Sequence, residues 1–140
     1  GEDQRVLRAV QIVVDEGLAK PILIGRTAVI EDNIKKLGLR LQHGVNIEIV
    51  DQEKNPSYDD FWKEYHQIMQ RKGVTVEYAQ REARRRSTLI AAMLVKFGKA
   101  DGMLCGTYSS YDIHLDFVKN VIGLKEGRST FFTLNALMLE

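Results

Sequence analysis

The sequence has few of the residues that cross-link small secreted proteins or bind metals. Its only cysteine, Cys105, cannot form a disulfide within the chain, and its three histidines are not at metal-ligand spacing. No apolar run approaches the roughly 20 residues that span a bilayer, and no signal-peptide pattern opens the chain. We therefore expect a reduced, cytoplasmic protein without a metal site in these residues.

An excess of charge of one sign is also absent. The 20 lysines and arginines nearly balance 19 acidic residues, so neither nucleic acid nor a membrane is an expected partner. With only two prolines and no low-complexity tract, we expect one unit over residues 1–140 without an internal boundary. We expect the chain to be the first part of a longer domain. A helix begins directly after the first residues, and the last residues form an apolar segment that would need covering on both faces.

What the sequence does have is a regular alternation of amphipathic and short apolar segments. Helices are expected over residues 3–16, 27–38, 57–73, 75–84, 87–98 and 109–123, and strands over 21–25, 47–50, 103–105 and 130–139. This order predicts an α/β fold, a three-layer α/β/α arrangement around a mainly parallel sheet. The helix caps expected from the sequence are Thr27, Ser57 with Asp60, Thr75, and Ser109 with Asp112.

The most informative segment follows the expected strand 103–105. The strand ends at Gly106, and a hydroxyl-rich loop comes next, made of Thr107, Tyr108, Ser109 and Ser110. Open α/β sheets bind ligands at the carboxyl ends of strands, and helix N-termini favour anions. The segment therefore predicts either a ligand-binding loop or an ordinary turn with a serine cap. Tyr108 or Tyr111 could stack on an adenine or cover the helix.

Arginines supply the sharpest charge feature. Four of them gather near the end of the fourth expected helix: Arg81, Arg84, Arg85 and Arg86. They could bind phosphate groups of a nucleotide or of coenzyme A, or they could be solvated side chains favoured at a helix C-terminus. Arg128, just before the last expected strand, could reach the same cleft or belong to a turn.

An aromatic stripe marks the third expected helix. It consists of Phe61, Trp62 and Tyr65, at spacings that place them on one helix face. Such a stripe is typical of a hydrophobic core, and it also suits a subunit interface.

Three stretches, at residues 2–9, 17–25 and 100–106, resemble in order the phosphate acetyl/butyryl-transferase family. Residues 36–39, 61–65, 69–75, 105–108 and 118–121 are similar to one branch of it, the phosphotransacetylase-like domains joined to bacterial NADP-dependent malic enzymes. The resemblance runs along nearly the whole chain, and it covers only about the first half of such a domain. It implies a fold of the phosphotransacetylase and isocitrate-dehydrogenase type.

The resemblance also implies a role in regulation. It suggests acetyl-CoA as the effector, a homo-oligomer, and a malic enzyme catalytic domain in the same protein that converts malate to pyruvate and CO2. NADP and a divalent metal, Mg or Mn, would bind only in that catalytic part. Within this chain we place the acetyl-CoA site on the loop and on one nearby cation, Arg128. The loop residues are Gly106, Thr107, Tyr108, Ser109 and Ser110.

One departure from the family bears on catalysis. Active phosphotransacetylases carry Arg-Pro in the helix after this loop, whereas this chain has Leu115, Asp116 and Phe117. The carboxylate of Asp116 would repel an acyl phosphate. The family's catalytic serine, arginine and aspartate motif lies in the second half of the domain, so we expect no catalytic residue here. The alternatives are a phosphate acetyltransferase that makes acetyl phosphate and a purely structural oligomerisation module.

Overall fold

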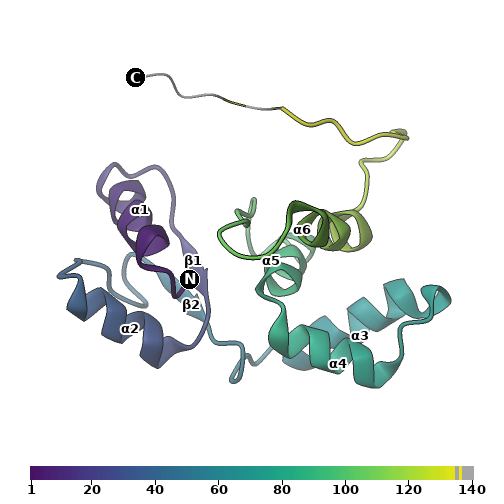
Figure 1. Cartoon of the computed structure of the whole chain (residues 1–140), viewed down its shortest axis with the longest axis horizontal. Coiled ribbons are helices and arrows are strands. Elements are labelled where there is room, and N and C mark those ends of the chain that lie inside the picture. The colour runs from purple at the N-terminus through teal and green to yellow at the C-terminus, as the bar shows by residue number, and fades with distance from the viewer. Residues whose placement is uncertain (135, 137–140) are drawn as a thin grey trace.

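The computed structural model describes residues 1–134 and 136 (Figure 1). The elements within them are α1 (Gln4–Asp15), β1 (Ile22–Ile24), α2 (Thr27–Lys36), β2 (Glu48–Val50), α3 (Tyr58–Met69), the short 3-10 helix η1 (Gln70–Lys72), α4 (Val76–Arg85), α5 (Ser87–Lys96), α6 (Tyr111–Phe117) and the π-helical turn η2 (Val118–Ile122). Each of the six helices expected from the sequence is present.

The sheet has two parallel strands joined through α2. β1 and β2 are paired in the register Ile22–Glu48, Leu23–Ile49 and Ile24–Val50. A parallel pair with a helical crossover is the elementary α/β unit, so the predicted fold class is confirmed on this smaller sheet.

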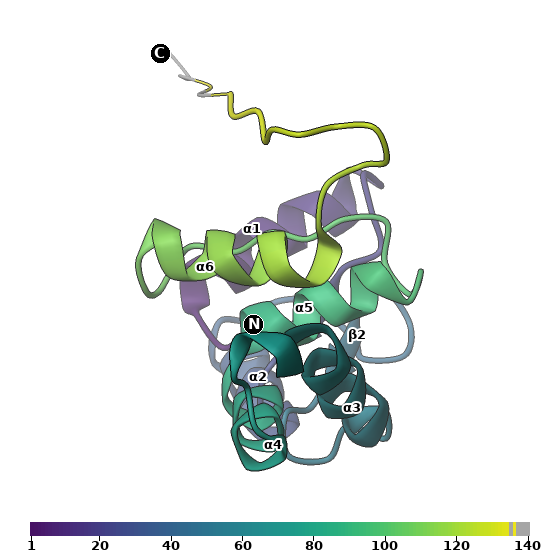
Figure 2. The same cartoon turned by 90° about the vertical axis from the view of Figure 1, so that its right-hand side faces the viewer.

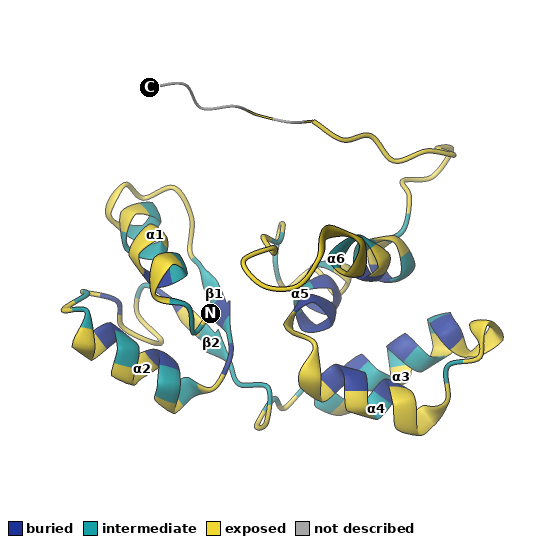
Figure 3. Ribbon diagram, viewed as in Figure 1, coloured by how far each residue is buried: buried dark blue, intermediate teal, exposed yellow. Residues whose placement is uncertain are grey.

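The two faces of β1 contact different helices. Leu23 belongs to a cluster with residues of α1 and α2, including Leu7, Ile30 and Ile34. Ile22 and Ile24 instead pack against a larger cluster formed by the helices from α3 onward. Successive side chains of a strand point to opposite faces, so helices cover the sheet on both sides as the sequence predicted (Figures 1 and 3).

The larger cluster forms a helical layer of its own. Its buried residues come from five elements and are Phe61, Tyr65, Met69, Ala79, Ala83, Leu89, Ile90, Ala92, Met93, Leu94, Phe117 and Val121. α5 is its centre, because six of its ten residues are buried, more than in any neighbouring helix. In the side view, α6 lies over α5, with α3 and α4 beneath (Figure 2).

The strand expected at residues 103–105 is not formed. Met103 packs partly buried against the helical cluster, but Leu104 is 102% exposed and Cys105 is exposed as well. A strand requires a hydrogen-bonded neighbour, and none of the described residues pairs with this segment. Cys105 is therefore not covered in the way that a residue of a buried strand would be. Of the strand expected at 130–139, residues 130–134 and 136 are not in a strand, and the remainder lies outside the described residues.

Of the predicted helix caps, only Thr75 is confirmed. Its Oγ1 accepts a hydrogen bond from the Tyr78 N–H at 3.2 Å. Thr27 is the first residue of α2 and does not cap it, and the Ser57 hydroxyl accepts from Lys99 Nζ at 2.8 Å instead of capping α3. The residue before α6 is Ser110, without a side-chain capping bond, so the cap predicted at Ser109 was wrong too. At the starts of α2 and α3, residues from distant segments provide the contacts: Asp51 accepts from the Thr27 N–H, and Lys99 donates to Ser57.

Candidate functional site

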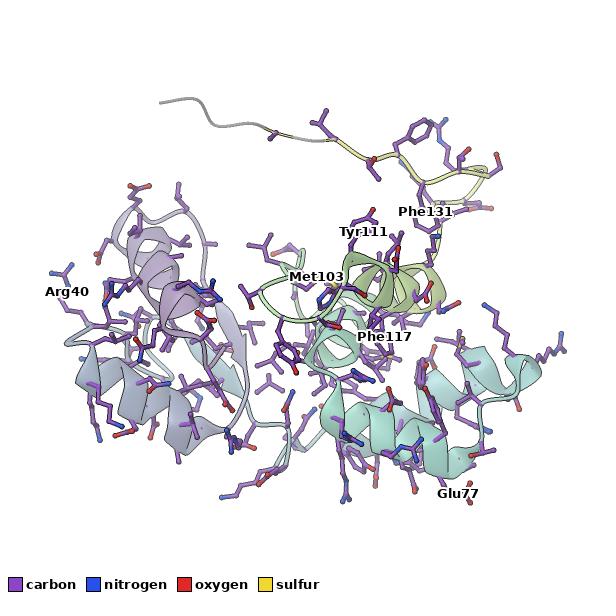
Figure 4. The ribbon with its side chains drawn as sticks, in the orientation of Figure 1. Arg40, Glu77, Met103, Tyr111, Phe117 and Phe131 are labelled. Atoms are coloured by element: carbon purple, nitrogen blue, oxygen red, sulfur yellow. The ribbon has the colours of Figure 1, made fainter. Side chains whose placement is uncertain are left out.

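The candidate loop, Gly106 to Ser110, connects the segment after α5 to the start of α6. All five residues are exposed, and Tyr108 is 88% exposed. None of the hydroxyls of Thr107, Ser109 and Ser110 forms a hydrogen bond to another element within the described residues. Tyr111, at the helix start, points away from the helical layer, whereas Phe117 points into it (Figure 4). The loop thus presents its polar groups outward.

Gly106 and Ser109 give the loop its shape. Gly106 has φ of 128° and Ser109 has φ of 77°, both on the side of the Ramachandran plot that L-residues rarely adopt. A Cβ at Gly106 would meet no described residue within 4 Å, so the glycine is required here by its backbone conformation.

A histidine ties the loop to α5. His114, on α6, has Nε2 2.6 Å from the carbonyl oxygen of Tyr108. Its Nδ1 lies 2.7 Å from Oγ1 of Thr88, which is 7% exposed on the first turn of α5. The imidazole therefore connects the exposed loop to a buried position in the helical layer.

The arginine run lies at the junction of α4 and α5, next to Thr88. Arg86 pairs with the buried carboxylate of Glu82 at 2.9 Å, and Arg84 lies over the ring of Tyr58 at 4.6 Å. Arg81 lies over Tyr78 at 5.0 Å. Arg85 is exposed, and within the described residues it takes part in no ion pair or aromatic contact.

The structure therefore brings together two of the three candidate groups. The His114–Thr88 contact places the loop beside the start of α5, which directly follows the arginine run. Arg128 lies elsewhere, because it follows η2 whereas the loop precedes α6. The seven residues of α6 and the five of η2 separate them, about 15–18 Å of helix.

A hollow that the sequence reasoning missed lies at the carboxyl ends of β1 and β2. It has a volume of about 880 Å³, and its charged lining residues are Arg26, Glu48, Asp51, Glu53, Lys54 and Lys99. Positive and negative charges are balanced there, so the lining does not define one class of ligand. The signal available in the sequence was the polar segment that directly follows β2.

Asp51 fixes the edge of this hollow. Its Oδ2 accepts from the Thr27 N–H and its Oδ1 from the Glu53 N–H, each at 2.9 Å. These two backbone donors, that of Thr27 first, lower the pKa of the Asp51 carboxyl. The carboxylate thus holds the first turn of α2 next to the segment that follows β2.

We expect Asp51→Ala to lower the free energy of unfolding by about 0.5–2 kcal/mol at neutral pH, as for other lost helix-start acceptors. A lowered folded-state pKa means that this contribution is complete above the ordinary value of about 4 and disappears as pH falls through the folded value. Urea denaturation at several pH values checks this. Glu53→Gln, at an exposed side chain without a bonded partner in the described residues, is the control. An equal Asp51→Ala effect at every pH would contradict the prediction.

The aromatic stripe of α3 belongs largely to the core. Phe61 and Tyr65 are 1% and 5% exposed, and burial raises the pKa of Tyr65 to about 12. Trp62 is half-buried, with Nε1 donating to Asp59 Oδ1 at 3.0 Å, so it alone of the three retains surface for a partner.

Within residues 1–134 and 136, no group of three His, Cys, Asp or Glu side chains could hold a metal ion. None of the helices described is long and apolar enough to cross a bilayer.

Comparison with known proteins identifies relatives of this chain. The phosphate acetyl/butaryl transferase family model matches residues 1–140. NADP-dependent malic enzymes of Escherichia coli and Haemophilus influenzae are 51% and 49% identical over 99% of the chain, which spans only 18% of either relative. The solved phosphotransacetylase of Streptococcus pyogenes superposes with a TM-score of 0.80 at 28% identity, over 91% of this chain and 37% of that one.

Proposed function

The chain belongs to the phosphate acetyl/butaryl transferase family, and from this premise we propose that it is the acetyl-CoA-responsive part of a malic enzyme's phosphotransacetylase-like domain. Its most similar relatives named above are NADP-dependent malic enzymes, of which it spans a small part. The parent protein would convert malate to pyruvate and CO2. NADP and Mg or Mn would bind in a catalytic domain outside this chain.

One observation carries the proposal: His114 bonds the hydroxyl-rich loop to Thr88, and Thr88 is two residues beyond the end of the arginine run. Coenzyme A has phosphate groups, and phosphates bind best to arginine and to N–H or O–H donors. The loop has hydroxyls without a cation, and the arginine run that ends two residues before Thr88 supplies positive charge, including the exposed Arg85, which has no ion pair within residues 1–134 and 136. Tyr108 offers an exposed ring for stacking. Arg128 is the weaker candidate because a helix separates it from the loop.

Regulation would then follow from linked equilibria. Acetyl-CoA that binds more tightly to one arrangement of the regulatory and catalytic domains shifts the population toward it. The alternative of acetyl transfer is disfavoured by Asp116, which is exposed on α6, near where an acyl phosphate would require a cation.

We expect the full-length protein to bind acetyl-CoA without forming acetyl-CoA from acetyl phosphate. Arg85→Ala should weaken binding about 10- to 100-fold, the loss of one charge-assisted hydrogen bond of roughly 1.5–3 kcal/mol. Titration calorimetry measures the affinity, and a phosphate-release assay measures transfer.

Arg71→Ala is the matched control, since Arg71 is an exposed arginine of η1 outside the arginine run and its loss should leave binding unchanged. A clear transfer rate would favour the acetyltransferase alternative. Absence of acetyl-CoA binding would favour the structural module.

A further inference from the structure

We propose that His114 is the positioning residue that anchors the loop Gly106 to Ser110 to α5, with a proton on Nε2. The anchoring concerns the loop itself. Its consequence for acetyl-CoA rests on the proposed function.

The proton position follows from the two partners. The Tyr108 carbonyl oxygen, 2.6 Å from Nε2, can only accept, so Nε2 must donate. In the neutral ring Nδ1 then carries a lone pair, and the Thr88 hydroxyl, 2.7 Å away, donates to it. The opposite neutral tautomer would set the Nε2 lone pair against the carbonyl oxygen. Nε2 therefore carries a proton in either charge state of the ring, and the Thr88 hydroxyl donates to Nδ1 of the neutral imidazole or accepts from the imidazolium.

The anchor matters because the loop has little else to hold it. Its five residues are exposed, Ser109 has a positive φ, and within the described residues its only other hydrogen bond is the local one from the His114 N–H to the Ser110 carbonyl at 3.4 Å. Thr88, in contrast, is buried on the helix at the centre of the cluster. His114 uses only a main-chain oxygen of the loop, so the hydroxyls of Thr107, Ser109 and Ser110 stay available to a ligand.

The same contact sets the spacing between the loop and the arginine run. Thr88 is two residues beyond Arg86, so a loop bonded through His114 is held at a fixed position relative to that cation. Without the bond, the hydroxyls and guanidinium groups would no longer be pre-organised for one ligand.

The test uses the full-length protein and hydrogen exchange measured by mass spectrometry. We expect His114→Phe and Thr88→Val to speed exchange in peptides covering residues 106–117 by about tenfold, because these include the His114 N–H that donates to the Ser110 carbonyl of the loop and the first turn of α6 that the anchor holds. Exchange in α1 should not change, which distinguishes loss of the anchor from global destabilisation. Thr88→Ser keeps the hydroxyl and should retain slow exchange, and Ser87→Ala, at the exposed neighbouring position, is the control.

Acetyl-CoA affinity, measured by calorimetry on the same variants, separates the two proposals. Faster loop exchange with about tenfold weaker binding supports both. Faster exchange with unchanged binding supports the anchor and contradicts the acetyl-CoA site. Unchanged loop exchange in both His114→Phe and Thr88→Val overturns the anchor, as does Thr88→Ser exchanging as fast as Thr88→Val.

Discussion

Replacing Gly106 by valine is expected to weaken acetyl-CoA binding by the full-length protein at least about 100-fold, a loss near 2.7 kcal/mol. The structure gives the reason, because Gly106 has φ of 128° and a β-branched residue strongly resists that conformation. The added side chain would meet open space, so the effect arises from reorientation of the loop and leaves the packing of the helices intact. Calorimetric titration measures the affinity, and circular dichroism checks the fold.

Gly102→Val provides the matched control. Gly102 is four residues earlier, is also surrounded by open space, and has no positive φ, so valine there should leave binding within a few-fold of the parent. Equal binding by both valine variants would place the acetyl-CoA site outside this loop.

Truncating Phe61 to alanine is expected to lower the free energy of unfolding by about 3–5 kcal/mol, the usual range for a buried phenylalanine. Phe61 is 1% exposed and stacks on Phe97 with ring centroids 5.7 Å apart. Lys99 Nζ lies 5.8 Å from the centroid of the Phe61 ring, so the substitution also removes a cation–π contact. Urea denaturation, with the midpoint and slope compared with those of the parent, measures the loss.

Phe132→Ala is the control for that experiment. Phe132 is 88% exposed, so the same change of residue type should alter stability by less than about 0.5 kcal/mol. A loss below about 1 kcal/mol for Phe61→Ala would show that α3 contributes little to the cooperative core.

Local patterns predicted the elements whose stabilising contacts are local or periodic. The alternation of apolar and polar residues predicted where α1 and α2 lie, and Thr75 caps α4 within three residues. The strand predicted at 103–105 is not formed, because an apolar run becomes a strand only when a neighbouring strand bonds to it. The α2 cap was also missed, since its acceptor, Asp51, lies 24 residues away.

The same difference between local and distant contacts decided what could be predicted of the candidate site. The hydroxyls and the glycine of the loop were evident from their order along the chain. The relation of the loop to α5 was not, because it depends on a hydrogen bond between Thr88 and His114, which are 26 residues apart. For the same reason His114 was noticed in the sequence but no role could be given to it.

The double-sided burial of β1 has a consequence for strand register. In a strand with one solvated face, slipping by one residue exposes apolar side chains, and this fixes the pairing. β1 is apolar toward both faces, with Ile22, Leu23 and Ile24, so burial of one face does little to fix its register. Contacts at the two ends of β1 also hold it against β2. The Glu48 N–H donates to the Pro21 carbonyl at 2.9 Å, the Gly25 N–H donates to the Val50 carbonyl at 3.1 Å, and Lys20 pairs with Glu48 at 2.6 Å. Main-chain bonds can form in any register, so the Lys20–Glu48 pair beside β1 is a contact that depends on this particular alignment, whereas the apolar residues of β1 contribute burial.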